Sequence, residues 1–210
     1  TELDHPTHAM MHSATHIPSL APIPKTQFEL RDLVLSWQGT EPIQDEELSI
    51  RPEQQQALDE GVWFHGVLQR ISPQQYRPVS KNIPEPHAVA SAFMISLADA
   101  QRALQRALTV YQDPELQIYF DPTRYQAAWN ELDLMTVDGK SMRIDRLVEL
   151  SDSLVILDYK LSIPKPNDSL YQKYSEQLSQ YRNELQRIYP DKVIKAILID
   201  AQGKSLPLIY

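Results

Sequence analysis

Residues 154–161 read LVILDYKL, a stretch that opens with four apolar residues and carries the polar group Asp158, Tyr159 and Lys160 before Leu161. A stretch that opens as a continuous apolar run, with turn residues before it and prolines after it, is typical of a β-strand buried on both faces. Side chains alternate along a strand, so Asp158 and Lys160 share one face and Tyr159 points to the other. The sequence therefore predicts a central strand that carries an acid and a lysine at its polar end.

Further strands and helices are predicted on both sides of this run. Alternating or apolar stretches predict strands at residues 125–137, 141–150 and 193–200, with a tight turn at residues 138–139. Helical periodicity covers residues 54–71, 93–111 and 170–188. Ser96 and Asp99 match a capping box, either at the start of the second helix or at the start of its second half. The order of these elements predicts an α/β domain with a central mixed sheet flanked by helices.

The first predicted helix carries a histidine on its apolar face. Residues at helical spacing predict one buried stripe, which contains Leu58, Val62, His65, Leu68 and Ile71. A lone histidine in such a stripe is more often a hydrogen-bonded core residue than a metal ligand. His65 becomes a candidate ligand if this helix packs over the acids of the strands.

Residues 1–50 differ from the rest of the chain. The first 25 residues hold four of the six histidines and four prolines without an apolar period, which predicts a linker or an extended arm. The histidine spacings of three and four also suggest metal binding, although incidental polar residues are the simpler interpretation. We expect this arm to precede a globular domain at residues 51–210.

The composition excludes several classes of protein. A length of 210 residues with 42% hydrophobic residues is enough for one domain with an appendage. The absence of cysteine excludes disulfides, thiol nucleophiles, cysteine-bound zinc and iron–sulfur clusters. No apolar run is long enough to span a membrane and no signal-peptide pattern is present, so we expect a soluble, cytoplasmic protein. The net charge is −8 and falls mostly in residues 41–60, so charge neither supports nor excludes binding to DNA.

Two acids and a lysine form the first candidate site. Asp145 lies in the predicted strand that precedes Asp158 and Lys160, about one hairpin away. Two carboxylates suit Mg²⁺ or Mn²⁺, and a nearby lysine can orient or deprotonate an attacking water. Asp158 and Lys160 would equally form a plain buried ion pair, and spacing alone leaves both interpretations open.

Four strings occur in a specific order along the chain. They are GVWFHGVLQ at residues 61–69, RIDRLV at 143–148, ILDYK at 156–160 and QLSQY at 177–181. Together, over roughly residues 55–200, they resemble the PD-(D/E)XK nuclease domain of the RecB/AddA type, the C-terminal nuclease module of UvrD-like helicase–nucleases. The resemblance implies a restriction-endonuclease-like core.

The resemblance also implies roles for individual residues. His65, Asp145 and Asp158 would bind Mg²⁺, with Mn²⁺ possible, and the backbone carbonyl of Tyr159 would be a further ligand. Asp145, Asp158 and Lys160 would be catalytic, with Lys160 positioning the attacking water and stabilising charge on the phosphate.

Three more residues match the family pattern. Gln177 and Tyr181 correspond to a Q-x-x-x-Y motif beside the DNA strand that is cut, although Tyr181 also lies on the apolar stripe of its helix. Glu131 corresponds to a glutamate on the strand before the hairpin and would support the ligands. As an exposed strand acid, Glu131 would have no role.

The implied function is exonuclease-type, metal-dependent hydrolysis of DNA in double-strand break repair and recombination. The chain lacks a GxxxxGK[ST] motif, so a helicase domain of the same polypeptide or a partner subunit would deliver single-stranded DNA. The absence of cysteine places it outside the branches with an iron–sulfur cluster, and Leu161 stands where family members often have Thr or Ser. The alternatives are a catalytically silent DNA-binding or docking module, an assembly protein that uses residues 1–50, and an unrelated α/β domain with plain ion pairs.

Overall fold

The computed structural model describes residues 52–74, 83–136 and 139–208. The helices are α2 (Pro52–Ile71), α3 (Pro86–Phe93), α4 (Leu97–Tyr111), α5 (Gln117–Phe120) and α6 (Ser169–Ile188). The strands are β1 (Ala127–Met135), β2 (Ser141–Glu149), β3 (Ser153–Lys160), β4 (Val193–Asp200) and β5 (Ser205–Pro207). In the described ranges they form a sheet in the order β1-β2-β3-β4-β5, in which β3 and β4 are parallel and the other neighbours antiparallel. The predicted α/β fold with a central mixed sheet flanked by helices is confirmed.

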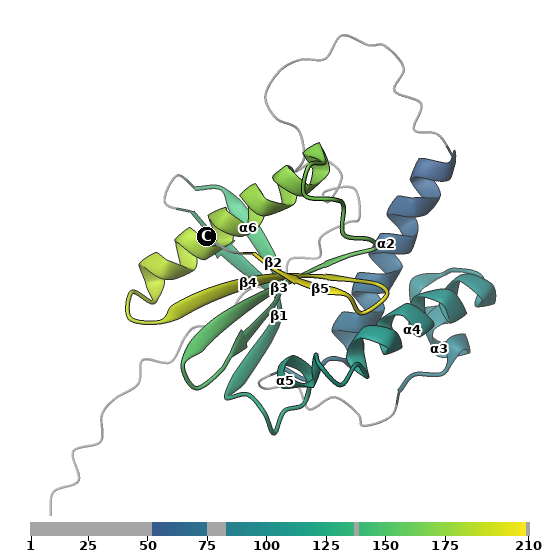
Figure 1. Ribbon diagram of the computed structural model, residues 1–210. Coiled ribbons are helices and arrows are strands. Elements are labelled where there is room, and N and C mark those ends of the chain that lie inside the picture. The colour runs from purple at the N-terminus through teal and green to yellow at the C-terminus, as the bar shows by residue number, and fades with distance from the viewer. Residues whose placement is uncertain (1–51, 75–82, 137–138, 209–210) are drawn as a thin grey trace, which may run out of the picture. The chain divides into compact units, whose positions relative to one another are not determined.

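Helices cover both faces of this sheet (Figure 1). One core cluster joins a face of the sheet to helices α2 to α5, and a second joins the opposite face to α6. Strand β3 contributes to both, because its residues from Ser153 to Tyr159 are all buried. The prediction of a strand buried on both faces is therefore confirmed. The predicted arm at residues 1–50 lies outside the described residues and stays a prediction.

Helix α2 is buried over only part of its length. Leu68 and Ile71 are buried as predicted, but Leu58 and Val62 are 58% and 49% exposed, so the prediction of one continuous buried stripe is wrong. The buried contacts of α2 begin at Phe64, because its first three turns extend past the sheet (Figure 1). No helix in the described part of the chain is long and apolar enough to cross a membrane.

The predicted helical stretch at residues 93–111 is divided between two helices. Met94 ends α3 in the left-handed conformation, with φ 54°, and Ser96 then caps α4 by accepting a hydrogen bond from Asp99 N. The capping box therefore starts a new helix. The sequence did not indicate α3 as a separate helix, nor the single turn of α5.

Halfway along the β1–β2 hairpin, the paired side chains change the face of the sheet on which they lie. Asn130 pairs with Arg146 and contacts the α2 side, whereas Leu132 pairs with Ile144 and packs on the α6 side. Glu131, between them, has φ 50°, a left-handed conformation that costs a non-glycine residue about 1–3 kcal/mol. The β2–β3 pairing also ends here, at Arg146 opposite Leu157. The switch therefore occurs where β2 separates from β3.

Two glycines inside α2 give a test of its packing. A Cβ on Gly66 would lie 2.5 Å from Cε1 of Phe93, whereas on Gly61 the nearest atoms, of Leu161, are 3.9 Å away. We expect Gly66→Ala to lower the free energy of unfolding by about 1–3 kcal/mol. Gly61→Ala should raise it by about 0.5–1 kcal/mol, because alanine favours the helix. Urea denaturation measures both, and equal stability of the two variants would contradict the close α2–α3 packing.

Candidate active site

The backbone of Tyr159 is the point at which the candidate residues meet. Its N–H donates to Asp145 Oδ2 at 2.7 Å, and its carbonyl accepts from His65 Nε2 at 2.6 Å. His65 comes from α2, Asp145 from β2, and the neighbours Asp158 and Lys160 are on β3 itself. The structure therefore brings the imidazole, two carboxylates and the lysine together at one end of β3.

Helix α2 packs over the acids, which was the condition for considering His65 a ligand. Nε2 of His65 donates to the Tyr159 carbonyl, and Nδ1 faces Asp145 Oδ2 at 3.5 Å. The rings of Phe64 and Tyr159 contact the imidazole edge-on and fix its orientation. His65 is thus held by the core and still points at an acid of the candidate site.

Asp158 and Lys160 form an ion pair on the α6 side of β3. Lys160 Nζ lies 2.6 Å from Asp158 Oδ2, and the ammonium also sits 4.6 Å from the centre of the Tyr174 ring. Asp158 is only 1% exposed, so this charge-assisted contact lies in the interior. The ion-pair interpretation of these two residues therefore matches their geometry.

Burial sets the protonation of this pair. The pKa of Asp158 is raised to about 6, mainly because the side chain is buried; Lys160 lowers it and the nearby Asp145 carboxylate raises it. Burial alone would lower the pKa of Lys160, but the carboxylates of Asp158 and Asp145 outweigh burial and the pKa is raised. Lys160 is therefore a charged ammonium that compensates a buried carboxylate.

Glu131 lies at the switch in the hairpin, in register with Asp145. Burial raises the pKa of Glu131, the Asp145 carboxylate raises it as well, and Arg143 and His65 lower it. Arg143 Nη1 is 3.6 Å from Glu131 Oε2. Glu131 is therefore neither fully exposed nor remote from the site, as a role in supporting the ligands requires.

Gln177 and Tyr181 face the same region from α6. Gln177 Nε2 donates to the hydroxyl of Tyr181 at 2.7 Å. The pKa of Tyr181 is raised to about 12, mainly by burial; the hydrogen bond with Gln177 lowers it, and the charges of Asp158 and Asp145 raise it. Tyr181 is only 5% exposed, so it is a core residue of α6 whose hydroxyl lies near the carboxylates.

The donor atoms fit a hard divalent cation in their chemistry. A buried carboxylate on Asp158, a second carboxylate on Asp145 and the Tyr159 carbonyl are ligands that Mg²⁺ and Mn²⁺ accept. Among the described residues, however, no three His, Cys, Asp or Glu side chains are grouped closely enough to hold a metal by themselves. The side chains instead engage one another in pairs, and a metal would have to displace Lys160 from Asp158.

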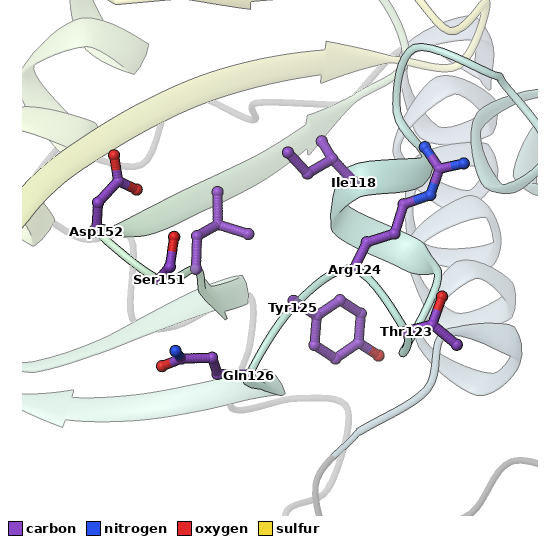
Figure 2. Close-up of a pocket in the computed structure, with 8 residues that line it drawn as sticks. Ile118, Thr123, Arg124, Tyr125, Gln126, Ser151 and Asp152 are labelled. Carbon is purple, nitrogen blue, oxygen red and sulfur yellow. The ribbon is translucent and has the colours of Figure 1, made fainter.

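A surface hollow lies away from these residues. It has a volume of about 340 Å³ and is formed by the segment before β1, the β2–β3 turn and Ile118 of α5 (Figure 2). Asp152, which lines it, is six residues from Asp158 along β3, or roughly 20 Å. The hollow is therefore at the opposite end of the sheet and does not belong to the candidate site.

The structure adds two kinds of residue that the sequence did not indicate. Tyr174 holds the Lys160 ammonium over its ring, but its place on the apolar stripe of α6 resembles that of any core residue. Asn130 and Arg146 flank Glu131 and Asp145 in the chain and bind the end of α2. For the second group the sequence offers only Pro73, which has no N–H and so indicates an unpaired carbonyl at Gln69 without indicating its partners.

Comparison with known proteins identifies a family over most of the chain. A family model described as the PD-(D/E)XK nuclease superfamily matches residues 43–206. No curated protein matches the chain. The matched range contains every candidate site residue.

Proposed function

The chain belongs to the PD-(D/E)XK nuclease superfamily, and from this premise we propose that it is a Mg²⁺-dependent deoxyribonuclease that hydrolyses phosphodiester bonds. The observation that carries the proposal is the convergence on the Tyr159 peptide. Its N–H meets Asp145, its carbonyl meets His65, and Asp158 and Lys160 precede and follow it. Such convergence of ionisable groups is typical of catalytic sites.

Two carboxylates and a carbonyl would hold the metal. Asp145 and Asp158 supply anionic oxygens, the Tyr159 carbonyl a neutral one, and His65 a nitrogen that makes Mn²⁺ acceptable as well. When bound, the divalent cation neutralises the phosphate and lowers the pKa of coordinated water. Glu131 would support Asp145 from the neighbouring position on β1.

Lys160 would handle the water and the charge of the phosphate. Its ammonium is charged and buried beside the carboxylates, so it can donate hydrogen bonds to an attacking water and to a phosphate oxygen at the same place. The water oxygen forms a bond to phosphorus and gives up a proton to solvent, the bond from phosphorus to the leaving oxygen breaks, and that oxygen takes up a proton from solvent. The Tyr174 ring would hold the ammonium in place whenever Asp158 binds the metal.

Gln177 and Tyr181 would line the path of the DNA strand. They are joined by a hydrogen bond on α6 beside the carboxylates. The Gln177 amide offers a further donor that is able to reach a phosphate or a sugar oxygen. Tyr181 would act mainly by orienting Gln177, because its own ring is buried.

We further propose that the chain belongs to the RecB/AddA branch and acts in double-strand break repair and recombination. The order and spacing of the four sequence strings support this assignment. A helicase domain of the same polypeptide or of a partner subunit would feed single-stranded DNA to the site. In the same proposal, residues 51–210 are the nuclease domain and residues 1–50 a linker or arm.

A catalytically silent DNA-binding module is the second candidate. The ion pair that occupies Asp158 favours it, as does the lack of a three-side-chain metal group among the described residues. A silent module would bind DNA without needing a metal. It would show no thermal stabilisation on titration with Mg²⁺.

Cleavage of end-labelled DNA tests the proposal. The full chain is incubated with linear and with circular single-stranded DNA in Mg²⁺, in Mn²⁺ or in EDTA. We expect the linear substrate to be shortened in either metal and to stay intact in EDTA, with a matching rise in Tm on adding Mg²⁺. Cleavage that persists in EDTA, or no cleavage together with no rise in Tm, would contradict the proposal.

A further inference from the structure

The carboxyl end of α2 lacks some of its own hydrogen-bond donors. In a helix the carbonyl of Gln69 would accept from the N–H of residue 73, but that residue is Pro73, which has none. The carbonyls of Ser72 and Pro73 follow directly and lie beyond the last turn. The carbonyls of Gln69, Ser72 and Pro73 therefore need hydrogen-bond donors from outside the helix, because this end of α2 packs against the sheet.

Side chains from the sheet supply these donors. Asn130 Nδ2 lies 3.1 Å from Gln69 O and 3.2 Å from Ser72 O, and so donates to the carbonyl that Pro73 leaves unpaired. Arg146 Nη1 donates to Pro73 O at 3.0 Å and to Asn130 Oδ1 at 2.5 Å. We call Asn130 and Arg146 the α2 clamp. Its positive charge also faces the negative end of the helix dipole.

Arg146 is held without a counter-ion. It is 0% exposed, it forms no salt bridge within the described ranges, and its remaining donors reach Tyr119 O at 3.1 and 2.9 Å. The rings of Phe120 and Tyr125 lie 5.2 and 5.6 Å from its guanidinium carbon. Burying a charge against neutral carbonyls and aromatic rings is costly, which indicates that Arg146 does more than fill space.

Each residue of the α2 clamp is next to a candidate site residue in the chain. Asn130 is followed directly by Glu131, and Arg146 is preceded directly by Asp145. The carbonyl that Asn130 binds, that of Gln69, lies one helical turn after His65. The clamp is therefore joined by short, rigid stretches of backbone to three of the candidate site residues.

We propose that Asn130 and Arg146 are positioning residues that set α2 on the sheet so that His65 meets Tyr159 and Asp145. The proposal rests on the metal-dependent function proposed above. Positioning groups that act through a ligand typically cost 10- to 100-fold in metal affinity when removed. Loss of the clamp lets the end of α2 move, and His65 moves with it.

A double-mutant cycle on Mn²⁺ affinity tests this role. Apparent Kd values are measured by calorimetry for the full chain, for Asn130→Ala, for His65→Ala and for the double variant. We expect Asn130→Ala to weaken Mn²⁺ binding by about 10-fold or more in the parent, and by less than about 2-fold in the His65→Ala background. The effect disappears there because the ligand that the clamp positions is already missing.

Two further variants separate positioning from general loss of stability. Asn130→Asp keeps an acceptor for Arg146 but replaces the donor that binds Gln69 O and Ser72 O, so it should weaken Mn²⁺ binding as Asn130→Ala does. Val110→Ala removes buried volume from α4, which carries none of the site residues, and should lower Tm without changing the Kd for Mn²⁺.

Each outcome decides the matter. Equal weakening by Asn130→Ala with and without His65, or weakening by Val110→Ala as large as that by Asn130→Ala, would overturn the positioning role and leave the proposed function standing. A parent chain that binds no Mn²⁺ would overturn both. Coupling to His65 together with an unaffected Val110→Ala variant supports the clamp.

Discussion

Replacing Asp158 by asparagine is expected to reduce DNA cleavage in Mg²⁺ by about 10³-fold or more, because a site that loses a metal carboxylate loses several kcal/mol of charge stabilisation. Asparagine has almost the same shape, so the buried position stays filled. Burial raises the pKa of Asp158, so a neutral side chain avoids a desolvation cost, although Lys160 loses its partner and some stability is lost with it. Cleavage of end-labelled single-stranded DNA measures the activity, and circular dichroism checks the fold.

Asp191→Asn is the matched control for this substitution. Asp191 is an exposed acid just before β4, and the same change of charge there should leave cleavage within about 2-fold of the parent. If Asp158→Asn cuts DNA as fast as Asp191→Asn, then Asp158 does not hold the catalytic metal. The assignment of the whole site would then be wrong.

Replacing Arg146 by alanine is expected to lower the free energy of unfolding by about 3–5 kcal/mol, a large part of the stability of an ordinary domain. The carbonyl of Tyr119 would lose its two donors and Asn130 Oδ1 would lose one, each in the interior. A buried group left unsatisfied costs about 1–3 kcal/mol, and the volume of the side chain is lost as well. Denaturation in urea measures the effect.

Arg143→Ala, three residues earlier on the same strand, is the control for Arg146→Ala. Arg143 is 39% exposed and pairs with Asp133 and Glu131, and a surface ion pair of this kind is worth about 0–1 kcal/mol. Similar losses in the two variants would mean that the buried hydrogen bonds of Arg146 contribute little. The account of how α2 is attached to the sheet would then need revision.

The central strand and its neighbours followed from the sequence because their patterns are local. The apolar run before Asp158 predicts burial on both faces, and β3 is buried on both faces. The alternation before and after Gly139 predicts the hairpin, although residue 138 of its turn lies outside the described residues. Each of these signals depends only on the spacing of apolar residues, which the sequence states directly.

The exposure of the first half of α2 did not follow from the sequence. Leu58 and Val62 keep the helical spacing of a buried stripe, yet both are exposed. Whether such a stripe is buried depends on how far the sheet extends along the helix, and the spacing does not show this. The break at Met94 was missed for a related reason. A single left-handed residue interrupts a helix without disturbing the apolar period on either side.

The candidate site was predicted in part. The sequence proposed His65, Asp145, Asp158 and Lys160 as neighbours, and the structure brings them to one peptide group, although none of their roles is thereby tested. The left-handed Glu131 was beyond prediction, because nothing in the residues around it requires a positive φ. The burial of Arg146 was equally hidden, because its partners are carbonyls, which every residue has.

The position of a bound metal tests the central claim most directly. Crystals of the full chain soaked in Mn²⁺ would reveal the ion by its anomalous scattering. The account predicts one strong peak bounded by the carboxylates of Asp145 and Asp158 and the carbonyl of Tyr159, with Lys160 withdrawn from Asp158. A strong peak elsewhere, or no peak with the Asp158–Lys160 ion pair intact, would contradict it.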